Sequence, residues 1–307
     1  MLTISPPLDD EDERNNLSGA ACNPHGVGVM IGDEKRYARF FTVGDGRLRP
    51  AARLYLLAKK EQGVKMAESD GEGVAWADGF FYLVGSHSRD RDGAAQASRH
   101  FVFRFPGDQE SAPDHDVGDA DDPSRRVERT SLDAVIAAHP VLRRHLDDTP
   151  GDTPDGSAPS HGVNIEGLAM VGSDMFVGFR GPVDDAGALV LRLDAAALFG
   201  GNATPRVRTF RLDLGPGQGV RDMAAVADGI LILSGPERRS GVAPNPELFF
   251  WRPGRAPVRL ARLAPSTGTT NPESINVLKE TKRAWRLLVL WDGEAGGLPM
   301  IVQLPKP

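Results

Sequence analysis

Residues 164–182 read Asn-Ile-Glu-Gly-Leu-Ala-Met-Val-Gly-Ser-Asp-Met-Phe-Val-Gly-Phe-Arg-Gly-Pro. An acidic residue, Glu166, opens a short apolar run, a Gly-Ser-Asp turn follows, and a second apolar run leads to Arg180. Two apolar runs of strand length on either side of a turn predict a β-hairpin. The stretch therefore predicts a β unit with a carboxylate at its start and a cation at its end.

Copies of this hairpin recur along the chain. Counting the quoted stretch, the copies begin at residues 18, 72, 166, 222 and 273. All but one of these spacings are close to the roughly 40 to 55 residues of a four-stranded propeller blade. The apolar strands are nearly continuous, as in residues 80–84, which is typical of sheets covered on both faces. We therefore predict an all-β fold, a β-propeller with five blades, with six blades as the alternative.

The long spacing between the second and third copies predicts an insertion at residues 106–160. It is rich in Asp, Pro and Gly, which is typical of loops, and its apolar spacing predicts a helix that starts near Ser131. The fifth copy has only one further strand, at 299–304. We expect residues 2–5 to supply the missing strand and so to close the ring. The whole chain, 1–307, is expected to form a single domain.

Composition excludes several classes of protein. A formal net charge of −6 argues against nucleic-acid binding, which needs a basic face to displace counterions. The single cysteine, Cys22, excludes an intrachain disulfide and fits a reducing compartment. No run approaches the ~18 apolar residues of a membrane-spanning helix, and the N-terminus lacks the features of a signal peptide. These features predict a cytoplasmic protein that binds neither nucleic acid nor membranes.

The repeated unit also predicts where a functional site lies. The innermost strand of a blade starts on the face to which the second strand returns, so polar groups at both points should meet at one mouth of the central funnel. The acids that open the inner strands are Glu72, Glu166, Asp222 and Glu273. The neighbouring loops carry His87, His161, Arg180, Gly181 and Arg238.

Three interpretations of this rim remain open. In the first, the four acids hold Ca²⁺ or a similar divalent cation, which binds six to eight oxygens. In the second, the cations, the histidines and Gly181 bind a small anionic ligand such as a phosphoester, and a metal or a pair of carboxylates activates the attacking water. In the third, which is purely structural, the acids accept backbone N–H groups at strand starts and pair with Arg180 and Arg221.

Residues 164–169 together with Arg180-Gly181-Pro182 resemble a bacterial family known as domain of unknown function 3616, which is marked by an Arg-Gly-Pro segment in a similar setting. The resemblance covers most of the chain from Glu72 onward. Where the family usually continues with another Arg-Gly, this chain has residues 183–186, Val-Asp-Asp-Ala. The Glu-Gly-aliphatic-Ala inner strand is also similar to that of esterase-like phytase propellers, which hydrolyse phosphoesters. These resemblances imply a propeller fold, and the second of them suggests phosphoester hydrolysis as the chemistry.

The favoured function is a small-molecule site at the funnel mouth, with metal-assisted phosphoester hydrolysis as its chemistry. Glu166 is then a metal or ligand contact, and Arg180 is the contact to the anion. The alternative is a non-catalytic scaffold that binds a protein through the blade rims and the insertion at 106–160.

Overall fold

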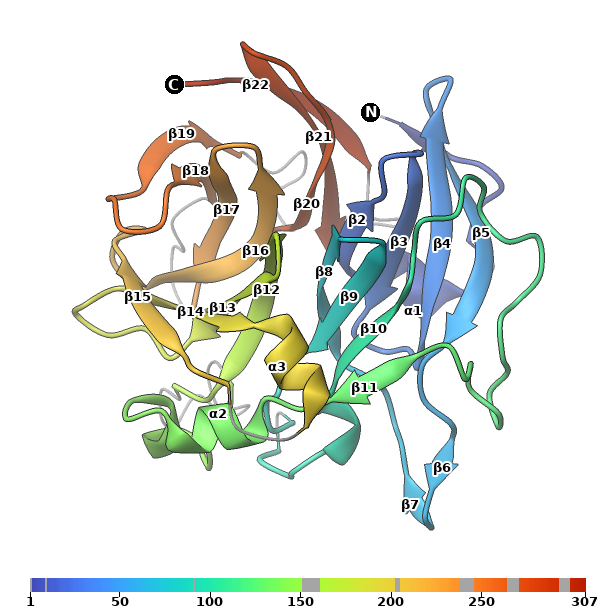
Figure 1. Cartoon of the computed structure of the whole chain (residues 1–307), viewed down its shortest axis with the longest axis horizontal. Coiled ribbons are helices and arrows are strands. Elements are labelled where there is room, and N and C mark those ends of the chain that lie inside the picture. Colours follow the sequence, from blue (N-terminus) through green and yellow to red (C-terminus); the bar gives the residue numbers. More distant parts are fainter. Residues whose placement is uncertain are drawn as a thin grey trace.

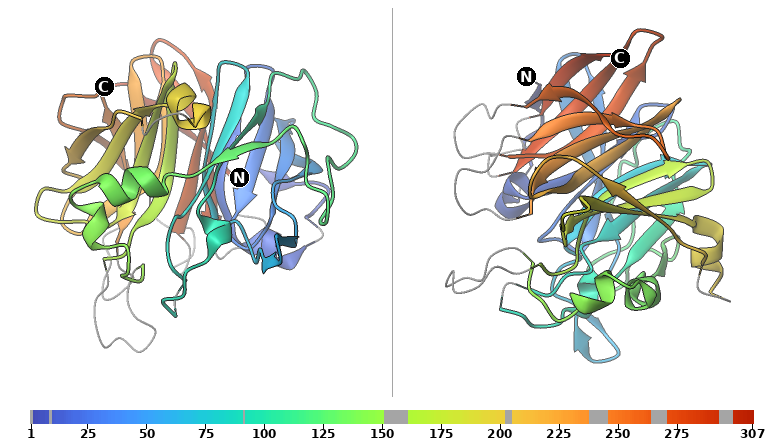
Figure 2. Two further views of the ribbon diagram at one scale, coloured as in Figure 1. Left: turned by 60° about the horizontal axis from the view of Figure 1, so that its bottom comes forward. Right: turned by 90° about the vertical axis from the view of Figure 1, so that its left-hand side faces the viewer.

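The chain folds into five β-sheets arranged as blades around one axis, which confirms the five-bladed propeller (Figure 1). The structure is a computed structural model, and it describes residues 2–8, 10–90, 92–150, 161–201, 205–237, 246–263, 271–292 and 299–307. Seen from the side, the strands of each blade run from one face of the molecule to the other (Figure 2).

Each blade is a meander whose strands follow one another outward from the axis. Blade 1 contains β2 (Leu17–Cys22), β3 (Val27–Gly32), β4 (Tyr37–Gly44) and β5 (Arg47–Tyr55). Blade 2 contains β8 (Gly71–Ala77), β9 (Phe80–Gly85), β10 (Val102–Pro106) and β11 (Glu128–Thr130). Blade 3 contains β12 (Asn164–Val171), β13 (Asp174–Gly181), β14 (Ala188–Asp194) and β15 (Arg208–Leu212). Blade 4 contains β16 (Gln218–Val226), β17 (Gly229–Pro236), β18 (Glu247–Trp251) and β19 (Val258–Arg262).

Blade 5 has three strands, β20 (Asn271–Glu280), β21 (Ala284–Asp292) and β22 (Met300–Pro305). The remaining elements are short and lie outside the blades, except that β1 extends blade 1. They are β1 (Thr3–Ile4), α1 (Glu11–Asn15), the hairpin β6 (Lys60–Glu61) and β7 (Val64–Lys65), α2 (Asp133–Ala138), α3 (Ala195–Gly200), and the 3₁₀ turns Ala97–Arg99 and Leu142–Arg144. Among the described residues, no helix is long and apolar enough to cross a membrane.

The expected closure of the last blade by residues 2–5 is wrong. Strand β1 pairs in parallel with β5, the outer strand of blade 1. Within the described chain, the one backbone hydrogen bond from residues 2–5 toward blade 5 runs from the Leu2 N–H to the carbonyl of Pro299 (2.7 Å). The short link from β1 through α1 to β2 keeps this segment beside its own blade. The junction of blades 1 and 5 is instead closed by apolar packing, in which Leu17 and Phe41 lie in one buried cluster with Leu288.

The predicted insertion at 106–160 contains more structure than expected. Strand β11 completes blade 2, and helix α2 follows between blades 2 and 3, as the apolar spacing predicted. The loop before β11 lies against the outer edge of blade 1, where Val117 exchanges backbone hydrogen bonds with Arg53 and Tyr55. Residues 151–160 of the insertion lie outside the described residues.

Glycines allow the inner strands to approach closely at the axis. A Cβ atom at Gly73 of β8 would lie 2.6 Å from the Cβ atom of Leu168, and one at Gly167 would lie 2.7 Å from a methyl group of Val220. Both distances are too short for real carbon contacts, so only glycine fits there. This packing fixes the positions of the acidic residues that directly precede these glycines.

Candidate functional site at the funnel mouth

Every innermost strand carries a β-bulge near its start. At this point in each blade one residue is left out of the regular pairing with the second strand; these residues are Ser18, Glu72, Glu166, Arg221 and Glu273. The inner strand of blade 5 has a second shift farther along, at Leu278. A bulge turns one side chain out of the alternating pattern, and here it does so once per blade at equivalent positions. The expected alignment of Asp222 with the other acids is therefore off by one residue, because Asp222 pairs regularly with Leu233 and Arg221 takes the bulge position.

The bulge residues of blades 3, 4 and 5 form a buried ionic network. Arg221 pairs through Nη1 with Glu273, and its Nε lies 3.6 Å from Oε2 of Glu166. Arg180, at the end of β13, donates from Nη1 to Oε1 of Glu166 (2.8 Å) and from Nε to the carbonyl of Pro236 (3.0 Å). All four charged side chains are largely withdrawn from solvent. The pairing of acids with Arg180 and Arg221, expected under the structural interpretation, is confirmed.

Asp222 has a different role from the bulge residues. Its carboxylate accepts the N–H of Met223 (2.7 Å) and, across the blade boundary, the N–H of Ile275 (2.7 Å). Burial raises the pKa of Asp222 well above its ordinary value, and these backbone hydrogen bonds oppose that shift. Asp222 thus connects blades 4 and 5 as a strand-start cap.

Glu72 is the one bulge carboxylate without a hydrogen bond or ion pair to any described residue. Burial raises the pKa of Glu72 well above the ordinary glutamate value, and the negative charges of Glu166 and Asp70 raise it further. The side chain still keeps partial exposure to solvent. Glu72 therefore favours its protonated form, in which a carboxyl group can donate a hydrogen bond.

His87 was predicted to bind ligand, but the described chain uses both of its ring nitrogens. The backbone N–H of Leu132 donates to Nε2 (3.1 Å), so Nδ1 carries the hydrogen and donates to the carbonyl of Gly85 (2.9 Å). Burial lowers the pKa of His87 to about 4, with the neighbouring His100 as a smaller cause. His87 is thus a neutral anchor for the start of helix α2, and we leave it out of the proposed site.

The Arg-Gly-Pro segment is held by a glutamate that sequence reasoning missed. Buried Glu237 accepts the N–H of Val183 (2.9 Å), and the same oxygen lies 2.9 Å from Nδ1 of His161. Gly181 packs so closely that a Cβ atom there would lie 2.8 Å from the carbonyl of Gly162. His161, with 37% of its side chain exposed, therefore stands beside Arg180 and Gly181 at the rim. The predicted contact Arg238 lies outside the described residues.

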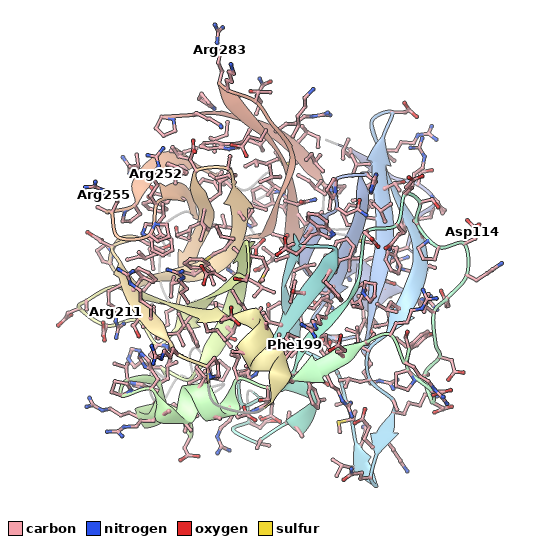
Figure 3. All side chains as sticks on the ribbon, viewed as in Figure 1. Asp114, Phe199, Arg211, Arg252, Arg255 and Arg283 are labelled. Atoms are coloured by element: carbon pink, nitrogen blue, oxygen red, sulfur yellow. The ribbon has the colours of Figure 1, made fainter. Side chains whose placement is uncertain are left out.

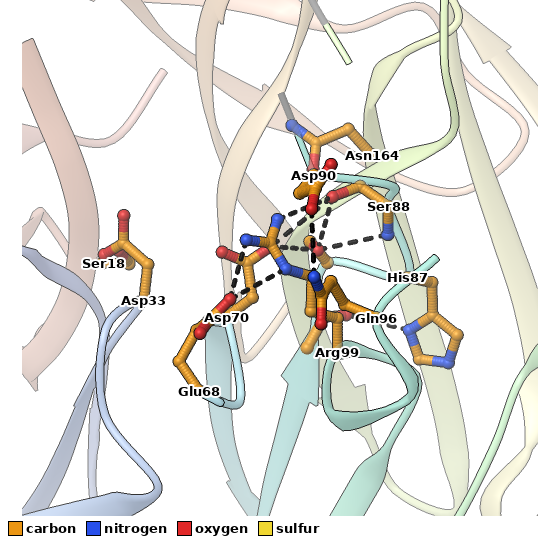
Figure 4. A network of polar contacts seen from close by, with 12 residues as sticks. Ser18, Asp33, Glu68, Asp70, His87, Ser88, Asp90, Gln96, Arg99 and Asn164 are labelled. Carbon is orange, nitrogen blue, oxygen red and sulfur yellow. Dashed lines mark hydrogen bonds and ion pairs between the residues drawn. The ribbon is translucent and has the colours of Figure 1, made fainter. Parts of the chain in front are cut away.

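A second network lines the rim at blade 2 (Figure 4). Arg99 donates from Nη1 to Asp70 (3.0 Å) and from Nη2 to Glu68 (2.8 Å), while Ser86 donates to Asp70. Burial raises the pKa of Asp70, and Arg99 opposes that shift. No pattern in the sequence predicts this cluster, because Arg99 lies on a 3₁₀ turn far along the chain from Glu68.

The arrangement does not gather the four predicted metal ligands. Within the described ranges, no group of three or more His, Cys, Asp or Glu side chains lies close enough to hold a metal ion. Glu166 and Glu273 both face Arg221, and Asp222 faces backbone N–H groups. Among the described residues, the mouth instead presents Arg180, whose Nη2 group has no described partner, within electrostatic reach of Glu72.

Comparisons with known proteins agree with the fold. A family model described as "Protein of unknown function (DUF3616)" matches residues 48–102 and 124–297. A search of the curated proteins found no match. Among solved structures, the phage phi92 endosialidase has a TM-score of 0.52 at 10% identity, over 94% of this chain and 53% of its own.

Two further solved structures are similar at lower scores. The PQQ-bound aldose sugar dehydrogenase of Streptomyces coelicolor has a TM-score of 0.45 at 11% identity, over 95% of this chain and 94% of its own. The GH43 protein BlXynB of Bacillus licheniformis has a TM-score of 0.47 at 7% identity, over 95% of this chain and 53% of its own. This chain thus spans about half the length of BlXynB and of the endosialidase, and at such identities the likeness concerns the fold alone.

Proposed function

The chain belongs to the DUF3616 family of proteins of unknown function, and we propose that its funnel mouth binds a small anionic ligand through Arg180. One observation carries the proposal. Nε and Nη1 of Arg180 are engaged by Pro236 and Glu166, whereas Nη2 has no partner among the described residues. These two hydrogen bonds hold the guanidinium in place, and 12% of the side chain remains exposed at the mouth. A fixed guanidinium with a spare N–H₂ group is suited to carboxylate or phosphate oxygens.

Glu72 supports an anion at this place. An ionised carboxylate there would repel the ligand, but the raised pKa of Glu72 favours the protonated form, which donates a hydrogen bond to an anion oxygen. His161 lies at the same rim, with 37% of its side chain exposed and its Nδ1 held by Glu237. The ligand would therefore meet one fixed cation and one neutral carboxyl donor.

Phosphoester hydrolysis is the finer form of this proposal. Water would attack phosphorus, the ester P–O bond would break, and the leaving alkoxide would take the proton of Glu72, which acts as general acid. The attacking water would pass one proton to a phosphate oxygen, and Glu72 would regain its proton as the phosphate product leaves. A general acid must be protonated at the working pH, and burial, which raises the pKa of Glu72, favours that form. A divalent cation such as Ca²⁺ needs six to eight oxygens, and Glu166 and Glu273 already face arginines. The cation would therefore bind only together with the substrate, whose phosphate supplies further oxygens.

Thermal unfolding in a panel of phosphorylated metabolites, each with and without Ca²⁺, tests the proposal. A ligand present at 100 times its Kd stabilises the folded chain by about 2.7 kcal/mol. Arg180→Met should abolish the stabilisation. Arg192→Met is the matched control, because Arg192 pairs with Asp174 on blade 3 outside the proposed site. Glu72→Gln should retain binding, since an amide also donates, but should lose any hydrolysis.

Two outcomes would contradict the proposal. The first is that no phosphorylated compound raises the unfolding temperature, with or without the cation. The second is that Arg180→Met and Arg192→Met bind equally well. Either result would favour the alternative, a non-catalytic scaffold that binds a protein.

A further inference from the structure

A cavity of about 490 Å³ lies on the opposite face, at the junction of blades 1 and 5. The β4–β5 and β2–β3 turns of blade 1 form one wall, and the end of β20 with Arg286 of β21 forms the other. Leu2, Cys22 and Trp76 contribute to its lining. A volume of this size is within the range of roughly 300 to 1,000 Å³ that is usual for small-molecule sites.

The cavity continues into the central channel. The narrow space between the inner strands, about 80 Å³, shares Cys22, Trp76 and Val277 with the cavity lining. Its other lining residues are mostly alanine, valine, leucine and methionine. Trp76 is held in place because its Nε1 donates to the carbonyl of Gly107 (3.1 Å). The inner end of the cavity therefore presents a fixed aromatic ring and an apolar recess.

The outer end of the cavity carries two cations that repel each other. Lys279 of β20 and Arg286 of β21 are directly opposite in the pairing register, so their side chains lie on the same face of the sheet. Neither side chain forms an ion pair or hydrogen bond with any other described residue. Like charges at this position destabilise a sheet. An anion bound between them would remove that cost.

The acids in the cavity lining do not neutralise this pair. Asp45 pairs with Arg49 (3.2 Å), and Glu280 pairs with Lys306. The hairpin tip adds two more cations, Lys282 and exposed Arg283, which points away from the blades (Figure 3). This hairpin is thus locally basic in a chain whose formal net charge is −6.

We propose that this cavity is a second binding site, separate from the funnel mouth, for a small organic anion with an apolar or aromatic body. The anionic group lies between Lys279 and Arg286, and the apolar body lies in the recess beside Trp76 and Val277. A carboxylate and a phosphate present the same chemistry to a Lys-Arg pair. The experiment below therefore includes one ligand of each kind.

Isothermal titration calorimetry on the full chain tests the site with three probes: phenyl phosphate, benzoate and benzyl alcohol, which is uncharged. We expect saturable binding of at least one of the two anions and much weaker binding of the alcohol. Lys279→Met with Arg286→Met should weaken anion binding by about tenfold or more, the usual loss for removing charged hydrogen-bond donors. Lys282→Met with Arg283→Met is the matched control, since it removes the same charges from the same hairpin outside the cavity lining.

The variants distinguish binding in the cavity from nonspecific electrostatic attraction to the hairpin and from binding at the funnel mouth. Equal weakening in the two double variants would show that hairpin charge alone attracts the anion, and it would overturn the proposal. Failure of both phenyl phosphate and benzoate to bind would also overturn it. Binding that persists in Arg180→Met is expected, because Arg180 lies at the other mouth. Loss of binding in that variant would place the probe at the funnel mouth instead, and would equally overturn the proposal.

Discussion

The two ends of the central channel handle charge in opposite ways. At the funnel mouth, Arg221 and Arg180 are buried and each contacts the carboxylate of Glu166. At the blade 1 and 5 junction, Lys279 and Arg286 are exposed, oppose each other, and have no acidic partner among the described residues. Buried charges persist only when they are paired, whereas exposed charges can stay unpaired at small cost because water and salt screen them.

This difference shows which end depends on charge for its structure. The funnel mouth is assembled from bulge residues of successive blades, so its ion pairs are part of the contacts between blades. The two cations of the junction cavity take part in no such pair within the described chain, so we expect the chain to fold without them. Loss of one cation should therefore lower the stability of the chain at the funnel mouth and raise it at the junction cavity.

Arg221→Met is expected to have the largest effect. It leaves Glu166 with a single arginine and Glu273 without a described partner, and breaking a buried pair on one side typically costs about 3 to 5 kcal/mol. Urea unfolding of the variant and the parent chain measures the difference. The double variant Arg221→Met with Glu273→Met should recover part of the loss, since it removes both charges. A single variant as stable as the parent would show that the network does not hold the blades together.

His87 should give the next largest effect, through pH. Its folded pKa of about 4 lies below the ordinary value of 6.5, so the unfolded chain binds more protons between these two pH values. The stability that His87 contributes is complete above about pH 6.5 and is lost as the pH falls to about 4, by about 3 kcal/mol. The pKa of His139 is also lowered, so the parent chain loses stability from both histidines.

The variant His87→Gln isolates the contribution of His87. It should flatten the fall in urea stability between pH 6.5 and 4, whatever its stability at neutral pH. The exposed His115→Gln serves as the control. An unchanged pH dependence in His87→Gln would mean that His87 is not held neutral by its contact with Leu132.

In the middle of the channel, stability should depend on side-chain volume and not on charge. Gly73→Ala places a Cβ atom 2.6 Å from the Cβ atom of Leu168, and overpacking of this kind costs about 1 to 3 kcal/mol. Gly200→Ala is the control, because a Cβ atom at that position, at the end of α3, would have no neighbour within 4 Å among the described residues. Equal stability of the two variants would show that the inner strands can move apart.

Local patterns made much of the fold predictable from the sequence. The hairpin begun by Glu166 and its copies are encoded in short stretches, so strand positions and blade count followed from their spacing. The pairing register is not local. Arg221 and Asp222 are neighbours in the sequence, and only the bulge decides which of them faces the axis. The pairing of β1 with β5, and not with blade 5, likewise depends on which strands lie close together in three dimensions.

The candidate site was predictable only in part for the same reason. The meeting of Glu166 with Arg180 followed from hairpin geometry, since both lie near the open end of one hairpin. The clamp by Glu237 joins neighbouring blades, and the cavity beside Trp76 draws its lining from separate segments of the chain. No sequence spacing encodes such contacts, because they depend on how the blades are arranged around the axis.

Lys279→Met tests the junction cavity. Its effect on stability should be the smallest of these variants, and it should be a gain where Arg221→Met gives a loss. Removing one of two like charges that face each other across a strand pair should stabilise the chain, without added ligand, by about 0.2 to 1 kcal/mol. Thermal unfolding at low salt measures the gain, and it should shrink as added salt screens the repulsion. Lys282→Met at the hairpin tip, outside the pair, should change little. If Lys279→Met destabilised the chain by as much as Arg221→Met does, both ends of the channel would depend on charge for folding, and the cavity cations would be structural.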